Sequence, residues 1–188
     1  MTDDAGPQLD ARNIALVGPM GVGKSTIARV LAGWLGRQSV DTDDLIVRAT
    51  GKSIAKVFAT DGEAAFRALE VDAIQAVCER DRLVVSVGGG AVLDSRNVAR
   101  LRASSTVVRL DCEPAVLARR VEHGRRAGTR PLLSGDENVE ATLRRLRDER
   151  EDAYASAAHL TVSTGDRPIE AVAAEVLRAL EDHVAAQR

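Results

Sequence analysis

The segment GPMGVGKST, residues 18–26, combines residue types that can bind the phosphates of a nucleotide. Four residues separate Gly18 from Gly23, and Lys24 and Ser25 follow at once. Glycines let a backbone loop turn its N–H groups towards a phosphate, a lysine neutralises the β- and γ-oxygens, and a serine hydroxyl can ligate Mg²⁺. The lysine is one of only three in a chain with 23 arginines. The spacing predicts a phosphate-binding loop for a nucleotide triphosphate.

Two other interpretations of this segment are weaker. A glycine-rich turn without a ligand does not account for the full pattern between an apolar segment and a helical one. A dinucleotide-binding loop would carry a third glycine where Thr26 stands. A nucleotide switch or motor ATPase normally has an apolar strand that ends in Asp, as VVRLDCE does at Asp111. Pro114 favours a turn or a helix cap at Asp111 instead, and neither a DxxG nor an NKxD motif begins there.

Two carboxylates follow the second apolar segment. Asp41 and Asp43 stand two residues apart in VDTDD, at the end of a strand expected over residues 38–42. Open α/β sheets bind ligands at the carboxyl ends of their strands. Either aspartate could be a helix cap or a functional group. Beside a phosphate loop, one carboxylate would hold a hydrated metal and the other would accept a hydrogen bond from a substrate hydroxyl.

Further candidate residues lie along the middle of the chain. In FATDGEAAFRALE, Thr60 and Glu63 have the spacing of a capping box, and Arg67 has Glu63 and Glu70 as alternative ion-pair partners. The glycines at 88–90 predict either a plain turn or a close approach of the backbone to a ligand. A polar insertion at residues 121–140 contains Arg125, Arg126 and Arg130. It suits a flap that closes on phosphates, or a solvated loop.

Five short apolar segments predict a parallel α/β sheet. We expect strands at residues 13–17, 38–42, 82–87, 105–110 and 159–164, with helices between them. The last helix has an apolar face that should pack on the sheet, formed by Ile169, Val172, Ala173, Val176, Leu177 and Leu180. We expect a disordered tail at residues 1–12 and a single domain at 13–188, with a lid at about 121–136.

Composition excludes several classes of protein. The net charge of −2 over 188 residues leaves no general basic excess for nucleic acid or an anionic membrane. Cys78 and Cys112 lack metal-type spacing, which fits a reducing compartment. The N-terminal residues do not read as a secretory signal, and no apolar run approaches the length of a membrane span. We therefore expect a cytoplasmic protein with small-molecule ligands.

In its motifs the chain resembles the shikimate kinases, within the nucleoside-monophosphate-kinase-like group of phosphate-loop proteins. The resemblance covers residues 13–154 and rests on GPMGVGKST, DTD, FATDGEAAFR with Glu70, GGGAV, RPLL and the spacing from Arg150 to Tyr154. It implies a three-layer fold with a five-stranded parallel sheet and a mobile lid. It also implies a cytoplasmic monomer that transfers the γ-phosphate of ATP to the 3-hydroxyl of shikimate with one Mg²⁺ ion, as a step towards chorismate and aromatic amino acids.

The resemblance also implies roles for individual residues. Asp43, Lys24 and Arg130 would be catalytic, and Ser25 and Asp41 would hold the metal. The ATP site would comprise Gly21, Val22, Gly23, Lys24, Ser25, Thr26, Arg120 and Arg130. The shikimate site would comprise Asp43, Phe58, Phe66, Arg67, Glu70, Gly88, Gly89, Gly90, Pro131, Leu132 and Arg150. Arg67 and Arg150 would converge on the substrate carboxylate. A gluconate kinase is the nearest alternative enzyme, because paired arginines suit either acid.

Overall fold

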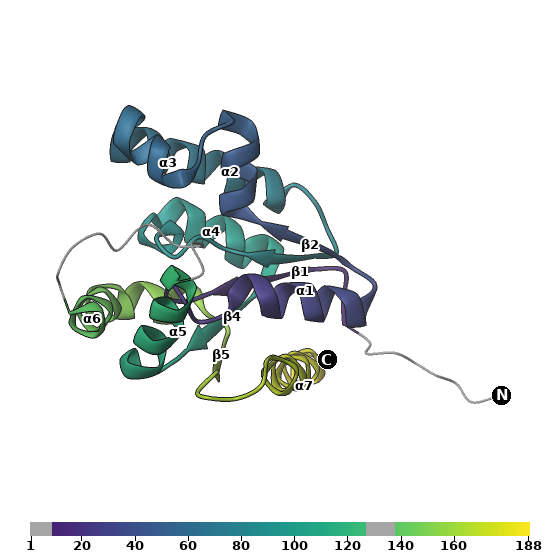
Figure 1. Ribbon diagram of the computed structural model, residues 1–188. Coiled ribbons are helices and arrows are strands. Elements are labelled where there is room, and N and C mark those ends of the chain that lie inside the picture. Colours follow the sequence, from purple (N-terminus) through teal and green to yellow (C-terminus); the bar gives the residue numbers. More distant parts are fainter. Residues whose placement is uncertain (1–8, 127–137) are drawn as a thin grey trace.

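The computed structural model describes residues 9–126 and 138–188, with side chains described outside 123–126. The polypeptide alternates between strands and helices for most of its length (Figure 1). In chain order the elements are β1 Asn13–Val17, α1 Lys24–Leu35, β2 Gln38–Asp41, α2 Thr42–Thr50, α3 Ile54–Cys78, β3 Leu83–Ser86, the 3₁₀ turn η1 Ala91–Leu93, α4 Ser95–Ser104, β4 Ser105–Asp111, α5 Pro114–Arg126, α6 Val139–Ala157, β5 Leu160–Ser163 and α7 Ile169–Ala185.

The five strands form one parallel sheet in the order β2-β3-β1-β4-β5. The predicted α/β class with a five-stranded parallel sheet is therefore confirmed. The first strand has the predicted bounds, whereas β2, β3 and β5 are shorter by one or two residues and β4 extends to Asp111. Every residue of β1 and β3 is buried, as expected for the central strands of a sheet covered on both faces.

Helices cover both faces of the sheet (Figure 1). Because side chains alternate along a strand, Ile14 and Leu16 face one layer and Ala15 and Val17 face the other. The first layer contains apolar residues of α1, α5 and α7, and the second contains residues of α3, α4 and the end of α6. The apolar face predicted for the last helix packs in the first layer, with Val172, Ala173, Val176 and Leu180 buried.

The helix α3 projects with α2 beyond the β2 edge of the sheet and is kinked (Figure 1). It begins after Ser53, whose hydroxyl accepts a hydrogen bond from the N–H of Lys56. Gly62 interrupts the helix with a φ of 83° and a ψ of 170°. The capping box predicted for Thr60 is wrong, since its hydroxyl donates back to the carbonyl of Lys56 inside the first part of α3. The second part, after the kink, carries Phe66, Arg67 and Glu70.

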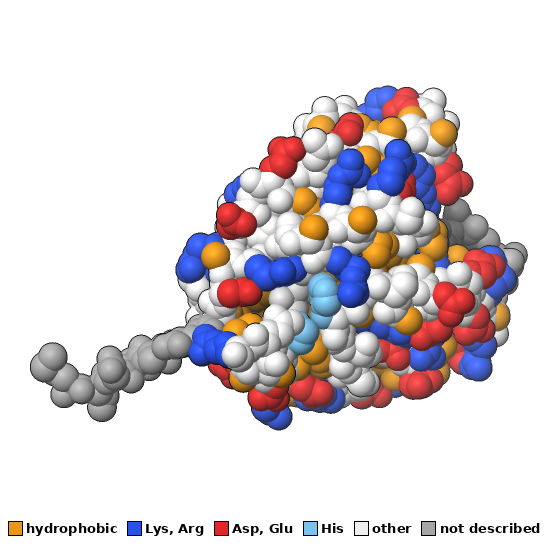
Figure 2. Space-filling view, turned by 180° about the vertical axis from the view of Figure 1, so that it is seen from behind, with side chains coloured by type: hydrophobic (Ala, Val, Ile, Leu, Met, Phe, Trp, Pro, Cys, Tyr) orange, Lys and Arg blue, Asp and Glu red, His pale blue; other side chains and the backbone are white. Residues whose placement is uncertain are grey.

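The structure describes part of the predicted tail and part of the predicted lid. Leu9 packs against the first core layer, and Arg37 donates to the carbonyl oxygens of Asp10 and Arg12. The lid prediction at 121–136 overlaps the end of α5, which continues to Arg126, and its remaining residues 127–136 lie outside the described part of the chain. No helix in the described ranges is long and apolar enough to cross a membrane. Acidic and basic side chains are interspersed on the face shown in Figure 2.

Candidate active site

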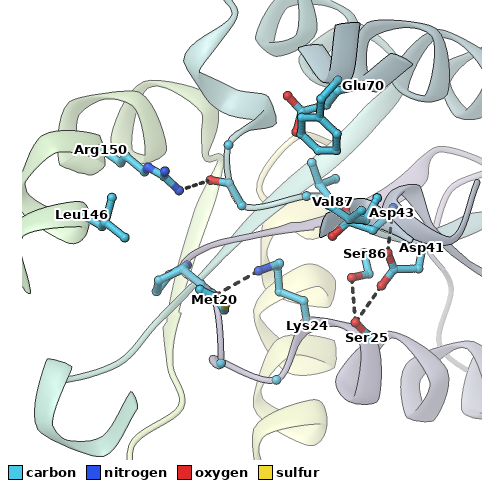
Figure 3. A pocket seen from close by; sticks show the side chains of 18 of the residues that line it. Met20, Lys24, Ser25, Asp41, Asp43, Glu70, Ser86, Val87, Leu146 and Arg150 are labelled. Atoms are coloured by element: carbon cyan, nitrogen blue, oxygen red, sulfur yellow. Dashed lines mark hydrogen bonds between the residues drawn. The ribbon is translucent and has the colours of Figure 1, made fainter. Parts of the chain in front are cut away.

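A cavity of about 570 Å³ opens at the carboxyl edge of the sheet (Figure 3). It lies between the phosphate loop, the start of α2, both parts of α3, the glycine segment after β3, and α6. Most of the residues that the sequence predicts for the site line it: Gly21, Gly23, Lys24, Ser25, Thr26, Asp41, Asp43, Phe58, Phe66, Arg67, Glu70, Gly88, Gly89, Gly90 and Arg150. Segments up to about 130 residues apart in the sequence thus meet around one space, because parallel strands bring their carboxyl ends to the same edge.

The phosphate loop connects β1 to α1 through backbone conformations that favour glycine. Gly18 has a φ of 142°, and a β-carbon there would overlap the carbonyl oxygen of Leu110 on the neighbouring strand. Gly23 has a φ of 103° and precedes the first residue of α1. The ammonium group of Lys24 donates to the carbonyl oxygens of Gly18, at 2.7 Å, and Pro19, at 3.0 Å. The phosphate loop ends at the N-terminus of α1, where backbone N–H groups and the helix dipole favour binding of an anion.

Three oxygen-bearing side chains meet beside the loop. Ser25 Oγ donates to Asp41 Oδ2 at 2.7 Å and lies 3.2 Å from Ser86 Oγ. The other oxygen of Asp41, Oδ1, accepts the N–H of Asp43 at 3.0 Å and caps α2. The helix-cap interpretation of Asp41 is therefore confirmed, while its other carboxylate oxygen contacts Ser25 and its role towards a metal stays a prediction. In the described ranges no three His, Cys, Asp or Glu side chains cluster as a metal cage.

Asp43 and Glu70 both lie close to Gly88 of the glycine segment. A β-carbon on Gly88 would lie 2.8 Å from Asp43 Oδ1 and 3.2 Å from Glu70 Oε1, and the Gly88 N–H donates to the hydroxyl of Thr42 at 2.9 Å. Burial raises the pKa of Asp43, and the negative charge of Asp41 raises this pKa further, while Lys24 opposes the shift. Burial also raises the pKa of Glu70, against the effect of Arg67. The backbone at Gly88 therefore lies close to these two carboxylates, and its close approach to a ligand stays a prediction.

Arg67 extends from the second part of α3 towards the glycine segment. It donates through Nη1 to Glu70 at 2.9 Å and through Nη2 to Glu63 at 3.1 Å, so both of the alternative helix ion pairs are present. Its guanidinium carbon lies 5.4 Å from the ring centroid of Phe66. A β-carbon on Gly90 would overlap this guanidinium, so a larger residue there would displace the head group of Arg67. The group is thus held by an aromatic ring, two carboxylates and a glycine.

Arg150 approaches the same glycines from α6. Its Nη1 donates to the carbonyl of Gly89 at 3.3 Å, and the hydroxyl of Tyr154 donates to this carbonyl at 2.6 Å. Arg147 also lines the cavity, but it forms an ion pair with Asp111 at 3.0 Å. The sequence-based prediction of a turn or helix cap at Asp111 is wrong, because this residue ends β4 and pairs with arginine. Pro114 is the first residue of α5, as predicted.

Two predicted nucleotide contacts do not line the cavity. Val22 is fully buried in the first core layer. Arg120 lies between the phosphate loop and the segment after β5, where it donates to the carbonyl of Val22 at 3.4 Å, to the hydroxyl of Thr164 at 3.2 Å and to the carbonyl of Gly165. The predicted lid residues lie outside the described part of the chain, namely Arg130, Pro131 and Leu132.

Sequence reasoning missed several residues of this cavity. Ser86 lies two residues before the three glycines, at the end of β3 and opposite Asp41 in the sheet register, which the sequence alone does not give. Met20 and Ile54 also line the cavity, and they carry no signal in their type or spacing. Leu146 precedes Arg150 by one helical turn, so a helical projection from Arg150 could have found it.

Comparison with known proteins identifies one family. The family model for shikimate kinase matches residues 20–181. The shikimate kinase of Symbiobacterium thermophilum is 41% identical over 170 residues, which cover 90% of this chain and 97% of that protein. The shikimate kinase of Geobacter metallireducens is 42% identical over 170 residues, which cover 90% of this chain and 92% of that protein.

Solved structures agree. The shikimate kinase of Acinetobacter baumannii in complex with shikimate superposes with a TM-score of 0.86 at 35% identity, covering 97% of this chain and 98% of that one. A gluconokinase from Sinorhizobium meliloti gives a TM-score of 0.60 at 18% identity, covering 94% of this chain and 97% of that one. The second similarity extends only to the fold.

Proposed function

The chain belongs to the shikimate kinase family. We propose that the protein transfers the γ-phosphate of ATP to the 3-hydroxyl of shikimate in this cavity. The products are shikimate 3-phosphate and ADP, in the synthesis of aromatic amino acids. The observation that supports this assignment best is the convergence of Lys24, Asp43, Arg67 and Arg150 on one cavity. Lys24 of the phosphate loop, Asp43 of α2 and Arg150 of α6 surround this space (Figure 3), and Arg67 lines it from α3.

The loop end of the cavity suits the nucleotide. Kinases with a phosphate loop generally use ATP together with a divalent metal. We assign Mg²⁺ to the position beside Ser25 and Asp41, where two hard oxygen donors lie 2.7 Å apart. This donor set fits Mg²⁺, which keeps several waters and takes few protein ligands. When bound, the ion would neutralise charge on the phosphate oxygens.

Lys24 can contact the same phosphates by exchanging its bonds to the carbonyl oxygens of Gly18 and Pro19. Its ammonium group would then balance charge that spreads over the transferred phosphoryl group.

Asp43 is the group that we assign to the accepting hydroxyl. Phosphoryl transfer proceeds through a loose transition state, so positioning of the hydroxyl contributes more than a strong base. Burial raises the pKa of Asp43, which favours uptake of the hydroxyl proton late in the reaction. Its carboxylate is limited on one side by Gly88, and its backbone N–H donates to Asp41, whose other carboxylate oxygen contacts Ser25.

The far end of the cavity suits a small cyclic acid. Arg67 and Arg150 would bind the carboxylate, since guanidinium groups form strong charge-assisted hydrogen bonds with carboxylates. Phe58 and Phe66 pack with ring centroids 4.4 Å apart and add apolar wall beside Arg67. Glu70, which is buried, orients Arg67 through its Nη1.

A coupled assay for ADP tests this function. We expect saturable ADP release with shikimate, and only background release with gluconate. Shikimate should also bind saturably to the protein with a non-hydrolysable ATP analogue, and this binding should vanish in Arg67→Ala. Arg96→Ala is a matched control, because Arg96 pairs with Asp94 on the exposed start of α4. Equal turnover with gluconate, or shikimate binding that survives in Arg67→Ala, would contradict the assignment.

A further inference from the structure

Four charged side chains connect the end of β4 to α6, outside the residues assigned above. Arg109 of β4 donates through Nη1 and Nη2 to the two carboxylate oxygens of Glu151, each at 2.7 Å. Two residues further along β4, Asp111 accepts a hydrogen bond from Arg147 Nη2 at 3.0 Å. Arg109 and Asp111 also approach each other, at 3.4 Å. We call these four residues the β4–α6 charge cluster.

Arg109 is the buried member of this cluster, whereas the side chain of its partner Glu151 is 46% exposed. The Arg109 side chain is only 8% exposed, and its guanidinium carbon lies 5.9 Å from the ring centroid of Tyr154. Two parallel N–H···O bonds fix the direction as well as the distance between the groups. The hydrogen bonds from Arg109 hold the pKa of Glu151 below its usual range. Since a buried guanidinium without its carboxylate is costly, this pair strongly favours one position of α6.

Apolar packing holds α6 mainly at the two ends of this part, through Leu143 at one end and Ala153, Tyr154 and Ala157 at the other. Leu143 and Tyr154 are buried, but no side chain of residues 144–153 is, and the structure describes this whole stretch. Arg150 lies within it, one residue before Glu151 and four residues before Tyr154. The helical turn that carries Arg150 is therefore held by charged contacts to β4 as well as by Tyr154, which is buried and whose hydroxyl donates to the carbonyl of Gly89.

The cluster also distinguishes the two cavity arginines of α6. Arg147 has its charge balanced by Asp111 at 3.0 Å and by Glu113 at 3.9 Å. Among the described residues, no carboxylate lies within ion-pair distance of Arg150, whose hydrogen-bond partner is the carbonyl of Gly89. The charge of Arg150 is thus the one that α6 offers to an anionic ligand in this part of the cavity.

We propose that Arg109 is a positioning residue for the acceptor acid, acting through Glu151 and Tyr154 on Arg150. It does not line the cavity itself, and its effect reaches the ligand through the placement of α6. The inference rests on the proposed function, because the acceptor carboxylate is the group that Arg150 would bind. Loss of the Arg109 contact should therefore weaken shikimate binding and leave the nucleotide end unchanged.

The test compares Arg109→Met and Glu151→Gln with the wild type in steady-state kinetics. We expect the KM for shikimate to rise by between roughly fivefold and a hundredfold, as for a contact displaced by up to an ångström, with the KM for ATP within about twofold. Arg109→Lys keeps the charge but loses the two-bond geometry, and it should recover only part of the affinity. Arg145→Gln is the matched control, because Arg145 pairs with Glu149 on the exposed side of the same helix at 2.8 Å.

Several outcomes would overturn the inference while leaving the function intact. One such outcome is that the wild-type protein phosphorylates shikimate and that the KM for shikimate is the same in the wild type and in both variants. Another is an equal rise in both KM values, which would indicate a general structural role. If Arg109→Met does not fold in a thermal unfolding check, Glu151→Gln decides, because it preserves side-chain size. Absence of shikimate turnover in the wild type would instead contradict the proposed function.

Discussion

Arg67 is shared between two carboxylates of unequal exposure, and this predicts that one of them competes with the substrate. Glu70 is 2% exposed and accepts from Nη1 at 2.9 Å, whereas Glu63 is 68% exposed and accepts from Nη2 at 3.1 Å. A substrate carboxylate that binds Arg67 must compete with these two partners. It displaces Glu63 if it binds Nη2, and it displaces Glu70 if it binds Nη1. Glu63 is the easier of the two to displace, because water can solvate its free carboxylate. Glu63→Gln should therefore strengthen shikimate binding.

The size of the effect follows from the exposure of the pair. Exposed ion pairs contribute about 0.2–1 kcal/mol, which corresponds to a decrease in the Kd for shikimate of about 1.4-fold to fivefold. Screening by salt should reduce the difference, since the Debye length falls to about 3 Å at 1 M ionic strength. The variant and the wild type should therefore converge as salt increases.

Calorimetric titration of shikimate into protein with ADP and Mg²⁺, at low and high salt, measures this difference. Glu140→Gln is the control, because Glu140 forms an exposed ion pair with Arg144 at the same helical spacing and at 3.0 Å, away from the glycine segment. A Kd that stays the same or increases in Glu63→Gln at low salt would refute the competition. A decrease of the same size in Glu140→Gln would show that the effect is general electrostatics.

Three further predictions concern the reaction, the loop and pH. Asp43→Asn should lower kcat by roughly 10²–10⁴-fold while the Kd for ATP stays within about twofold, because Asp43 orients the hydroxyl and not the nucleotide. A loss of ATP affinity in a titration as large as the loss of kcat would argue against this role. Gly18→Ala should lower the free energy of unfolding in urea by at least about 1–3 kcal/mol, because its φ is positive and a β-carbon overlaps the Leu110 carbonyl; Gly33→Ala, in an open position of α1, should be neutral or stabilising. Burial and nearby positive charges lower the pKa of His159, whose Nδ1 accepts a backbone N–H at 2.9 Å. Its contribution to stability is therefore present above the unfolded-state pKa and is lost as pH falls through the folded-state pKa. Urea unfolding between pH 7.5 and 5 should show this loss, and an equal pH dependence in His159→Gln would contradict it.

Much of the fold could be predicted because strand and helix patterns are local. The apolar segment of β1 matches its strand residue for residue, and the face of α7 follows from spacing alone. The strand order could not be derived from periodicity, because each segment shows that it is buried but not which neighbour it pairs with. The helix start predicted at Thr60 failed for a local reason: the kink at Gly62 lies after this residue, and the helix had already begun at Ile54.

The site divides in the same way. The phosphate loop and the pair Asp41 and Asp43 could be predicted because their residues are adjacent in sequence and have a characteristic spacing. Ser86 could not, since a single serine at the end of a strand is common and its partner Ser25 is 61 positions away. Arg109 and Glu151 are 42 positions apart, and each alone suggests an exposed charge. Contacts of this kind become visible only when the register of the sheet and the rotation of α6 are known.

The bonds from Lys24 to the carbonyl oxygens of Gly18 and Pro19 explain why a lysine suits this position in an arginine-rich chain. An ammonium on a flexible four-carbon stem can exchange one oxygen for another by rotation, whereas a planar guanidinium would have to reorient as a unit. The ammonium group of Lys24 therefore stabilises the phosphate loop through these two hydrogen bonds before an anion binds. Nucleotide binding then becomes an exchange of partners rather than an ordering of the chain, and little conformational entropy has to be lost on association.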